Sequence, residues 1–209
     1  MTDTNLRNNG PFDESEASFG DENRVDLGGL LLSVPAGVEL QVQADQASGR
    51  ITALTLRHGE SGMQLQPYAA RKSGGMWEEV IASITTSVNS SGGLIEQVEG
   101  PWGVELNAQI KANESAGTGS ALQPARFVGI DGPRWFLRAV FLGKAARDRD
   151  AAQVLSECLR TAVVIRGDSA MAPGAPLALR IPKDSMSPEQ SELKPPSPFE
   201  RGPEITEIR

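Results

Sequence analysis

The residues best suited to nucleophilic chemistry, His58, Ser61 and Cys158, stand in patterns that do not support it. The segment HGESG at 58–62 is similar to the G-x-S-x-G turn of serine hydrolases, but the final glycine of that pattern would fall on Met63. The chain has one histidine, so a Ser–His–Asp triad could use only His58 as its base. Cys158 falls on the apolar side of a predicted helix, which is typical of an unreactive core thiol. We therefore predict no catalytic residue, no metal site and no cofactor.

A second candidate is the run of arginines and aromatic residues in RFVGIDGPRWFLRAVF at 126–141. Asp131–Gly132 is a strong turn pair, and a two-residue turn would place Val128 opposite Trp135. One face of this hairpin would then belong to the core. The opposite face would present Phe127, Arg134, Phe136 and Arg138.

Aromatic rings between arginines are typical of a protein interface or of a site for an anionic ligand. This set is therefore the predicted partner surface. Two alternatives stay open at this point. A helix could cover the phenylalanines while the arginines extend to solvent. A three-residue turn that includes Pro133 would shift the register and exchange the two faces.

The elements that must position these residues are mostly strands. Apolar and polar residues alternate in segments joined by short turns, which predicts strands over 25–34, 38–44, 51–57, 63–68, 94–99, 104–110, 122–130, 134–142 and 162–166. Hairpins dominate, and there is no strand–helix–strand alternation. The sequence therefore predicts an α+β fold, a mostly antiparallel sheet with two main helices packed on it.

The two helices are predicted from an apolar repeat of 3.6 residues over 77–88 and 151–159. Ser73 can cap the first helix, and Gly92–Gly93 is expected to end it. Trp77 and Trp135 are predicted to lie in the core. Trp102 is predicted to be exposed in the turn at 100–103.

The two ends of the chain differ from its middle in composition. Residues 1–24 hold six acids and two bases, and residues 182–209 hold six acids, four bases and several prolines. Neither has a hydrophobic period, so both are predicted to be disordered tails, one acidic and one proline-rich. The single α+β domain is predicted to span residues 25–181.

Charge and composition also limit the partners. The net charge is −7, which disfavours nucleic acid and anionic membranes, and no apolar run is long enough to span a bilayer. The N-terminal residues do not form a secretory signal, and the single cysteine excludes an internal disulfide. We therefore expect a cytoplasmic protein.

Several segments resemble an actinobacterial domain-of-unknown-function family, number 3710. The resemblance rests on RVDLGGLLLSVPAGVEL at 24–40, TLRHGESGMQLQPYAA at 55–70, GMWEEV at 75–80, the hairpin at 126–141 and VVIRGDSAMAPGAPLALRIP at 163–182. It implies cytoplasmic actinobacterial origin and carries over no catalytic residue. The order of elements also resembles a Mog1/PsbP-type sandwich, whose members usually bind proteins.

Two functions follow as hypotheses. The first is a non-catalytic protein-interaction domain with an unknown protein partner. The alternative is a small anionic-ligand binder, or an enzyme, that uses an arginine cluster on the 126–141 hairpin. A deep pocket with convergent arginines would favour the ligand, and a flat exposed surface of Phe and Arg would favour the protein partner.

Overall fold

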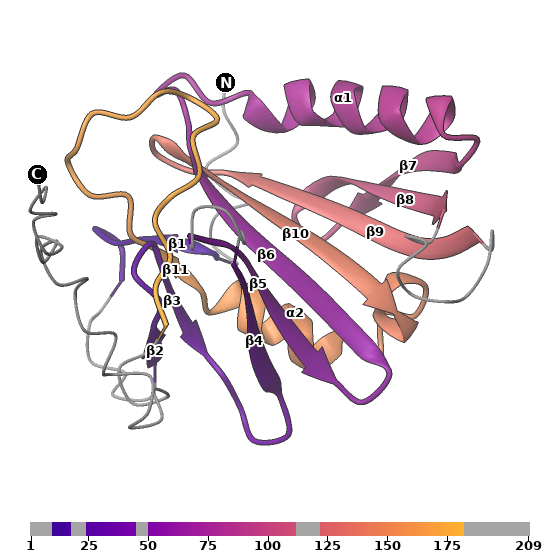
Figure 1. Ribbon diagram of the computed structural model, residues 1–209, viewed down its shortest axis with the longest axis horizontal. Coiled ribbons are helices and arrows are strands. Elements are labelled where there is room, and N and C mark those ends of the chain that lie inside the picture. The colour runs from indigo at the N-terminus through magenta and orange to yellow at the C-terminus, as the bar shows by residue number, and fades with distance from the viewer. Residues whose placement is uncertain (1–9, 18–23, 45–49, 112–121, 182–209) are drawn as a thin grey trace, which may run out of the picture.

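Antiparallel hairpins build most of the molecule (Figure 1). The computed structural model describes residues 10–17, 24–44, 50–111 and 122–181. Of the predicted tails at 1–24 and 182–209, residues 1–9, 18–23 and 182–209 lie outside the described residues. The elements are, in chain order, β1 Phe12–Asp13, β2 Arg24–Asp26, β3 Leu30–Ser33, β4 Glu39–Ala44, β5 Ile51–His58, β6 Ser61–Ala69, α1 Met76–Ser90, β7 Leu94–Gly100, β8 Gly103–Lys111, β9 Leu122–Asp131, β10 Trp135–Gly143, the 3₁₀ helix η3 Lys144–Ala146, α2 Gln153–Arg160 and β11 Val163–Val164.

The main sheet has seven antiparallel strands in the order β4-β5-β6-β10-β9-β8-β7. A second sheet of four short strands has the order β1-β11-β3-β2, with β1 and β11 parallel. This is the α+β class that the sequence predicts. In the described part of the chain, no helix is both long and apolar enough to cross a membrane.

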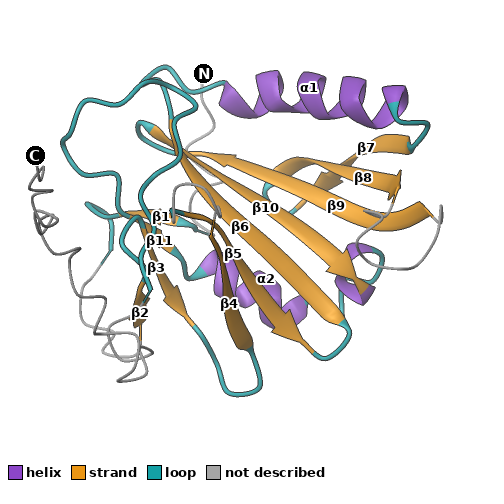
Figure 2. Cartoon of the chain, in the orientation of Figure 1, coloured by secondary structure: helices purple, strands orange, loops and turns teal. Residues whose placement is uncertain are grey.

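The two helices lie on opposite sides of the main sheet, as Figure 2 shows. Helix α1 covers strands β7, β8 and β9 on one face, and α2 packs against β3 and β5 on the other. The larger core fills the space between the main sheet, the small sheet and α2, and includes Trp135, Phe141 and Leu155. A smaller core under α1 contains Trp77, Leu106 and Phe136. The main sheet therefore has a covered face on each side.

The N-terminus of helix α1 is capped by a side chain from a strand that is distant in the sequence. Gly75 stands at the N-cap position and makes no side-chain cap, so the predicted cap at Ser73 is wrong. Instead, Asp131 at the end of β9 accepts hydrogen bonds from the backbone N–H groups of Met76 at 3.1 Å and Trp77 at 3.2 Å. The carboxylate satisfies N–H groups that have no partner within the helix. The turn pair Asp131–Gly132 therefore also fixes α1 on the sheet.

The register of the 126–141 hairpin differs from the predicted one. Val128 lies opposite Ala139, not Trp135, because four residues, 132–135, separate the paired residues Asp131 and Phe136. Arg134 has a positive φ of 62° and lies in this loop, before β10 begins. The two faces nevertheless divide as predicted, because the register shift is an even number of residues. Val128, Ile130, Trp135, Leu137, Ala139 and Phe141 all belong to the larger core.

Part of the predicted acidic tail belongs to the fold. Strand β1 pairs with β11, and Asp13 is buried and accepts a 2.8 Å hydrogen bond from Nε1 of Trp135. The backbone oxygen of Gly10 accepts a 3.2 Å hydrogen bond from Nε1 of Trp102. Trp102 is consequently buried, and its predicted exposure is wrong. The folded domain begins before residue 25 because polar contacts to two tryptophans hold a segment that has no hydrophobic period.

Candidate functional site

The residues predicted as a partner surface do not form one exposed patch. Phe136 is completely buried, Phe127 and Arg138 are half-buried, and Arg134 is exposed in the hairpin loop. The prediction that Phe136 faces outward is therefore wrong. The alternative in which a helix covers the phenylalanines describes the structure.

Helix α1 buries Phe136 through Trp77. The two rings stack with centroids 6.1 Å apart, and Leu106 of β8 completes this small core. Trp77 reaches the sheet because β9 has Gly129 beneath it; a Cβ there would lie 2.2 Å from the indole. The indole Nε1 donates a 2.7 Å hydrogen bond to the backbone oxygen of Val104. The aromatic residues on this face serve packing.

The two arginines of the predicted surface are held separately. Arg138 donates a hydrogen bond to the side-chain oxygen of Gln66, and its guanidinium carbon lies 5.8 Å from the centre of the Tyr68 ring. Arg134 lies 3.9 Å from the carboxylate of Asp168 across exposed side chains. Contacts of this second kind contribute little to stability. The structure does not bring Arg134 and Arg138 together on one site.

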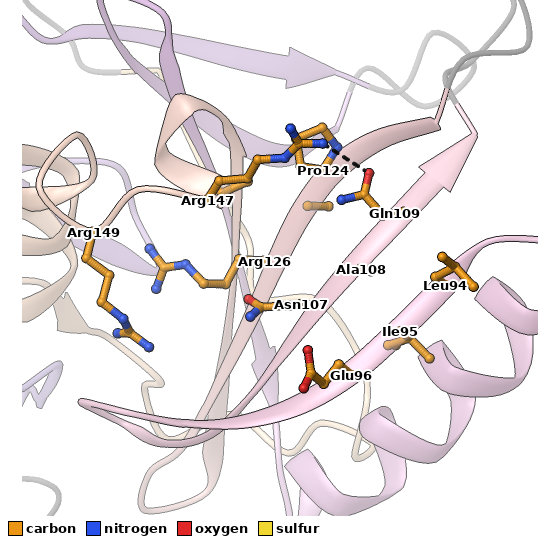
Figure 3. Close-up of a pocket in the computed structure, with 12 residues that line it drawn as sticks. Leu94, Ile95, Glu96, Asn107, Ala108, Gln109, Pro124, Arg126, Arg147 and Arg149 are labelled. Carbon is orange, nitrogen blue, oxygen red and sulfur yellow. Dashed lines mark hydrogen bonds between the residues drawn. The ribbon is translucent and has the colours of Figure 1, made fainter.

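Arginines do converge on the other face of the main sheet, at a cavity of about 510 Å³ (Figure 3). Its floor consists of two rows of residues that lie side by side on β7, β8 and β9. The register places Leu94, Gln109 and Pro124 in the first row and Glu96, Asn107 and Arg126 in the second. Ala146, Arg147 and Arg149 line it from η3 and from the segment that leads to α2. We call this space the arginine cavity.

Arg126 is fixed by a buried ion pair. Its Nη1 lies 3.1 Å from Oε2 of Glu105, and its Nη2 donates a 3.1 Å hydrogen bond to the backbone oxygen of Ala145. The guanidinium carbon also lies 4.1 Å from the centre of the Phe141 ring. Burial lowers the pKa of Arg126, and the neighbouring Glu105 carboxylate partly offsets this effect. The carboxylate therefore keeps a charged guanidinium at the inner end of the cavity.

Arg147 and Arg149 are held more loosely. Nη2 of Arg149 lies 3.4 Å from Oε2 of Glu105, and its side chain is 52% exposed. Nη2 of Arg147 donates a long 3.4 Å hydrogen bond to the side-chain oxygen of Gln109. Each guanidinium has five N–H donors, so both retain donors for a further partner. The three arginines face two carboxylates, Glu96 and Glu105, so the cavity is positive in an acidic protein.

The residues first considered for nucleophilic chemistry, His58, Ser61 and Cys158, each have a structural setting of their own. His58 and Ser61 flank the turn between β5 and β6, and the Ser61 hydroxyl donates to the backbone oxygen of Ala151 at 3.2 Å. Cys158 is buried, and burial raises the pKa of its thiol to about 11. Among the described residues, no group of three His, Cys, Asp or Glu side chains is placed to hold a metal ion.

Sequence reasoning missed most of the arginine cavity. Arg126 was part of the 126–141 segment. Arg147 and Arg149 come directly after the short 3₁₀ helix η3, where the sequence has no hydrophobic period. Glu105 and Asn107 alternate with apolar residues on β8, which is typical of a face turned to water. The pairing of β8 with β9, which brings Asn107 beside Arg126, was the signal that could have revealed the site.

Comparison with known proteins identifies a family for this chain. A family model described as "Protein of unknown function (DUF3710)" matches residues 10–187. No curated protein and no solved structure matches the chain. The expected Mog1/PsbP-type likeness and the expected actinobacterial origin therefore stay predictions. The match starts where the described N-terminal segment starts and includes every residue of the arginine cavity. The chain belongs to the family described as Protein of unknown function (DUF3710).

Proposed function

We propose that this domain is a non-catalytic binding domain whose ligand carries an anionic group held in the arginine cavity. The observation that carries the proposal is the convergence of Arg126, Arg147 and Arg149 on one cavity. Its volume of about 510 Å³ lies within the range of small-molecule sites. Guanidinium groups bind carboxylates and phosphates through paired, charge-assisted hydrogen bonds.

The cavity combines a rigid element with adaptable ones. Arg126 is 4% exposed and is held by Glu105, so its position is set before any ligand arrives. Arg147 and Arg149 are exposed and can rotate towards an anion. A fixed charge at the inner end and mobile donors at the mouth suit a ligand that enters from solvent. Preorganisation of the fixed part reduces the entropy lost on binding.

Binding rather than catalysis is favoured by the chemistry present. Among the described residues, the cavity is lined by arginines, amides, apolar side chains and one carboxylate, Glu96, with no nucleophile beside a base. Ser61 hydrogen bonds to the backbone, and Cys158 is a buried thiol with a raised pKa. Nucleophilic catalysis requires a base within hydrogen-bond reach of the attacking atom.

A protein partner is the second candidate. Leu94 is 66% exposed at the start of β7, which is the edge strand of the main sheet, and it borders the arginine cavity. An exposed leucine on an edge strand beside a charged cavity suits a partner that places an acidic side chain in the cavity. The same arginines would then carry the interaction.

The test is titration with small anions followed by calorimetry and thermal unfolding. Inorganic phosphate and citrate should bind the wild type, and the double variant Arg147→Ala/Arg149→Ala should lose about ten-fold or more in affinity, since two charged hydrogen-bond donors are removed. The matched control Arg57→Ala/Arg71→Ala removes the same charge from exposed arginines outside the cavity. Equal losses in both double variants, or no binding to the wild type, would contradict the proposal.

A further inference from the structure

We infer that the ligand of the arginine cavity is a zwitterion about the size of a dipeptide, with a carboxylate at one end and an ammonium group at the other. This inference rests on the proposed function and adds the positive end of the ligand. It comes from the charges of the cavity floor. The second floor row runs Glu96, Asn107, Arg126 across three adjacent strands, so it is acidic at one end and basic at the other.

The register places these three side chains on the same face of the sheet. Glu96 is paired with Asn107, and Asn107 is paired with Arg126. Directly opposed residues on antiparallel strands project to the same side. Figure 3 shows Arg126 and Arg149 at one side of the cavity and Glu96 at another, with Asn107 between them in this view. The cavity is therefore polarised along the direction that crosses the strands.

In this row one buried acceptor lacks a donor, and one carboxylate lacks a cationic partner among the described residues. Oδ1 of Asn107 is buried and has no hydrogen-bond partner. Glu96 is exposed on β7, and no ion pair joins it to another described residue. Buried acceptors are almost always satisfied in folded proteins, so an unpaired one on a residue that lines the cavity indicates a missing donor. An ammonium group supplies three N–H donors and a positive charge, which serves both acceptors.

The opposite charge belongs at the arginine end. Arg147 and Arg149 retain free donors, and Arg126 supplies a fixed positive charge beneath them. A polyanion would fit this end but would be repelled by Glu96 at the other. A simple cation would suit Glu96 but would meet three guanidinium groups. A ligand with separated opposite charges satisfies both ends.

The dimensions set the size of the ligand. Strands lie about 4.8 Å apart, so β7 and β9 are about 10 Å apart, and the side chains of both ends reach inward. An extended dipeptide spans about 7 Å between its termini, at about 3.3–3.6 Å per residue. The first floor row adds Leu94 and Pro124, which offer apolar contact to a small side chain. Dialanine is therefore a suitable probe.

The experiment compares dialanine with two capped forms by calorimetry. N-acetyl-dialanine lacks the ammonium group, and dialanine amide lacks the carboxylate. Dialanine should bind about ten-fold or more tightly than either, because each cap removes one charge-assisted interaction. Glu96→Gln should abolish the preference for dialanine over its acetylated form, and it should not weaken phosphate binding, because it removes a negative charge from the cavity.

Glu99→Gln is the matched control, because it removes the same charge from the same strand on the face towards α1. It should retain the preference for the free amine. If N-acetyl-dialanine binds the wild type as tightly as dialanine, or if Glu96→Gln retains the preference, the zwitterion inference is overturned and anion binding stands. If neither phosphate nor any of the three peptides binds, the proposed function fails as well.

Discussion

The two faces of strands β7, β8 and β9 are both covered, but by opposite chemistry. On one face, Trp77 and Ile84 of α1 pack on Leu106 and Phe136 in an apolar contact. On the other face, η3 and the following segment cover Glu105, Asn107 and Arg126 and leave a cavity. Burying charges on the second face is costly. Apolar side chains of similar volume in place of a buried ion pair often leave stability unchanged or raise it. This difference is one reason for our proposal that the first face serves folding and the second serves binding.

Removal of Trp77 should have the largest effect on stability and no effect on the cavity. Trp77→Ala removes the ring that stacks on Phe136 and leaves a void under α1, which should lower the free energy of unfolding by about 3–5 kcal/mol. Urea denaturation measures this loss. Below the unfolding transition, phosphate affinity should stay within about two-fold of wild type, since Trp77 packs on the opposite face of β8 and β9 from the arginines and, in the described part of the chain, shares no side-chain partner with them. A variant of wild-type stability would show that α1 contributes little.

Removal of one partner from the buried ion pair should damage both folding and binding. Glu105→Ala leaves Arg126 charged and buried without its carboxylate, at a cost of about 3–5 kcal/mol. The paired replacement Glu105→Leu/Arg126→Met should regain most of that stability, because apolar side chains of similar size fill the space. It should still lose anion affinity. Full anion binding by this stable double variant would remove Arg126 from the site.

Asp131 should give a smaller effect with a defined pH dependence. Burial raises the pKa of Asp131 above its usual 3.8, and the backbone N–H groups of α1 oppose the shift. The native state therefore keeps its proton to a higher pH than the unfolded chain, and this contribution to stability falls as the pH rises through that interval. Asp131→Asn cannot titrate, so the stability difference, wild type minus variant, should decrease as the pH rises above 3.8. Denaturation at several pH values checks the slope; a difference that grows with pH would contradict the account.

Substitution of the two hairpin arginines should have the smallest effect. Arg134→Ala/Arg138→Ala changes partly exposed side chains that lie outside the arginine cavity, so stability should fall by about 1 kcal/mol or less. Phosphate and dialanine should bind as they do to the wild type. A clear loss of binding in this variant would show that the site includes Arg134 or Arg138, as predicted from the sequence alone.

The fold was largely predictable from periodicity, and the site was not. The apolar repeat from Trp77 to Val88 gave α1, and alternation gave the strands and the division of the 126–141 hairpin into two faces. The predicted register of the hairpin was wrong because the alternation of apolar and polar residues does not give the length of the loop. That length depends on the backbone around Arg134. The burial of Phe136 depends on Gly129, whose missing Cβ admits Trp77, a residue 52 positions earlier in the chain.

The contacts missed from the sequence are all between distant segments. Asp131 caps α1, Gly10 and Asp13 bind tryptophans, and Glu105 holds Arg126. Each is a single polar contact without a repeating pattern. Periodicity reports which side of an element is apolar, and it does not report which polar side chain meets which. A polar face of a strand that another segment covers in the fold therefore has the same sequence pattern as a face exposed to water.

The most direct test of the central claim is nuclear magnetic resonance of the arginine side chains during titration with inorganic phosphate. We predict saturable shifts of the Nε–Hε signals of Arg147 and Arg149, with a smaller response at Arg126, which is already paired. Arg57 and Arg71, both outside the cavity, should not move. If the signals of Arg147 and Arg149 do not shift, or shift no more than those of Arg57 and Arg71, the arginine cavity is not an anion site.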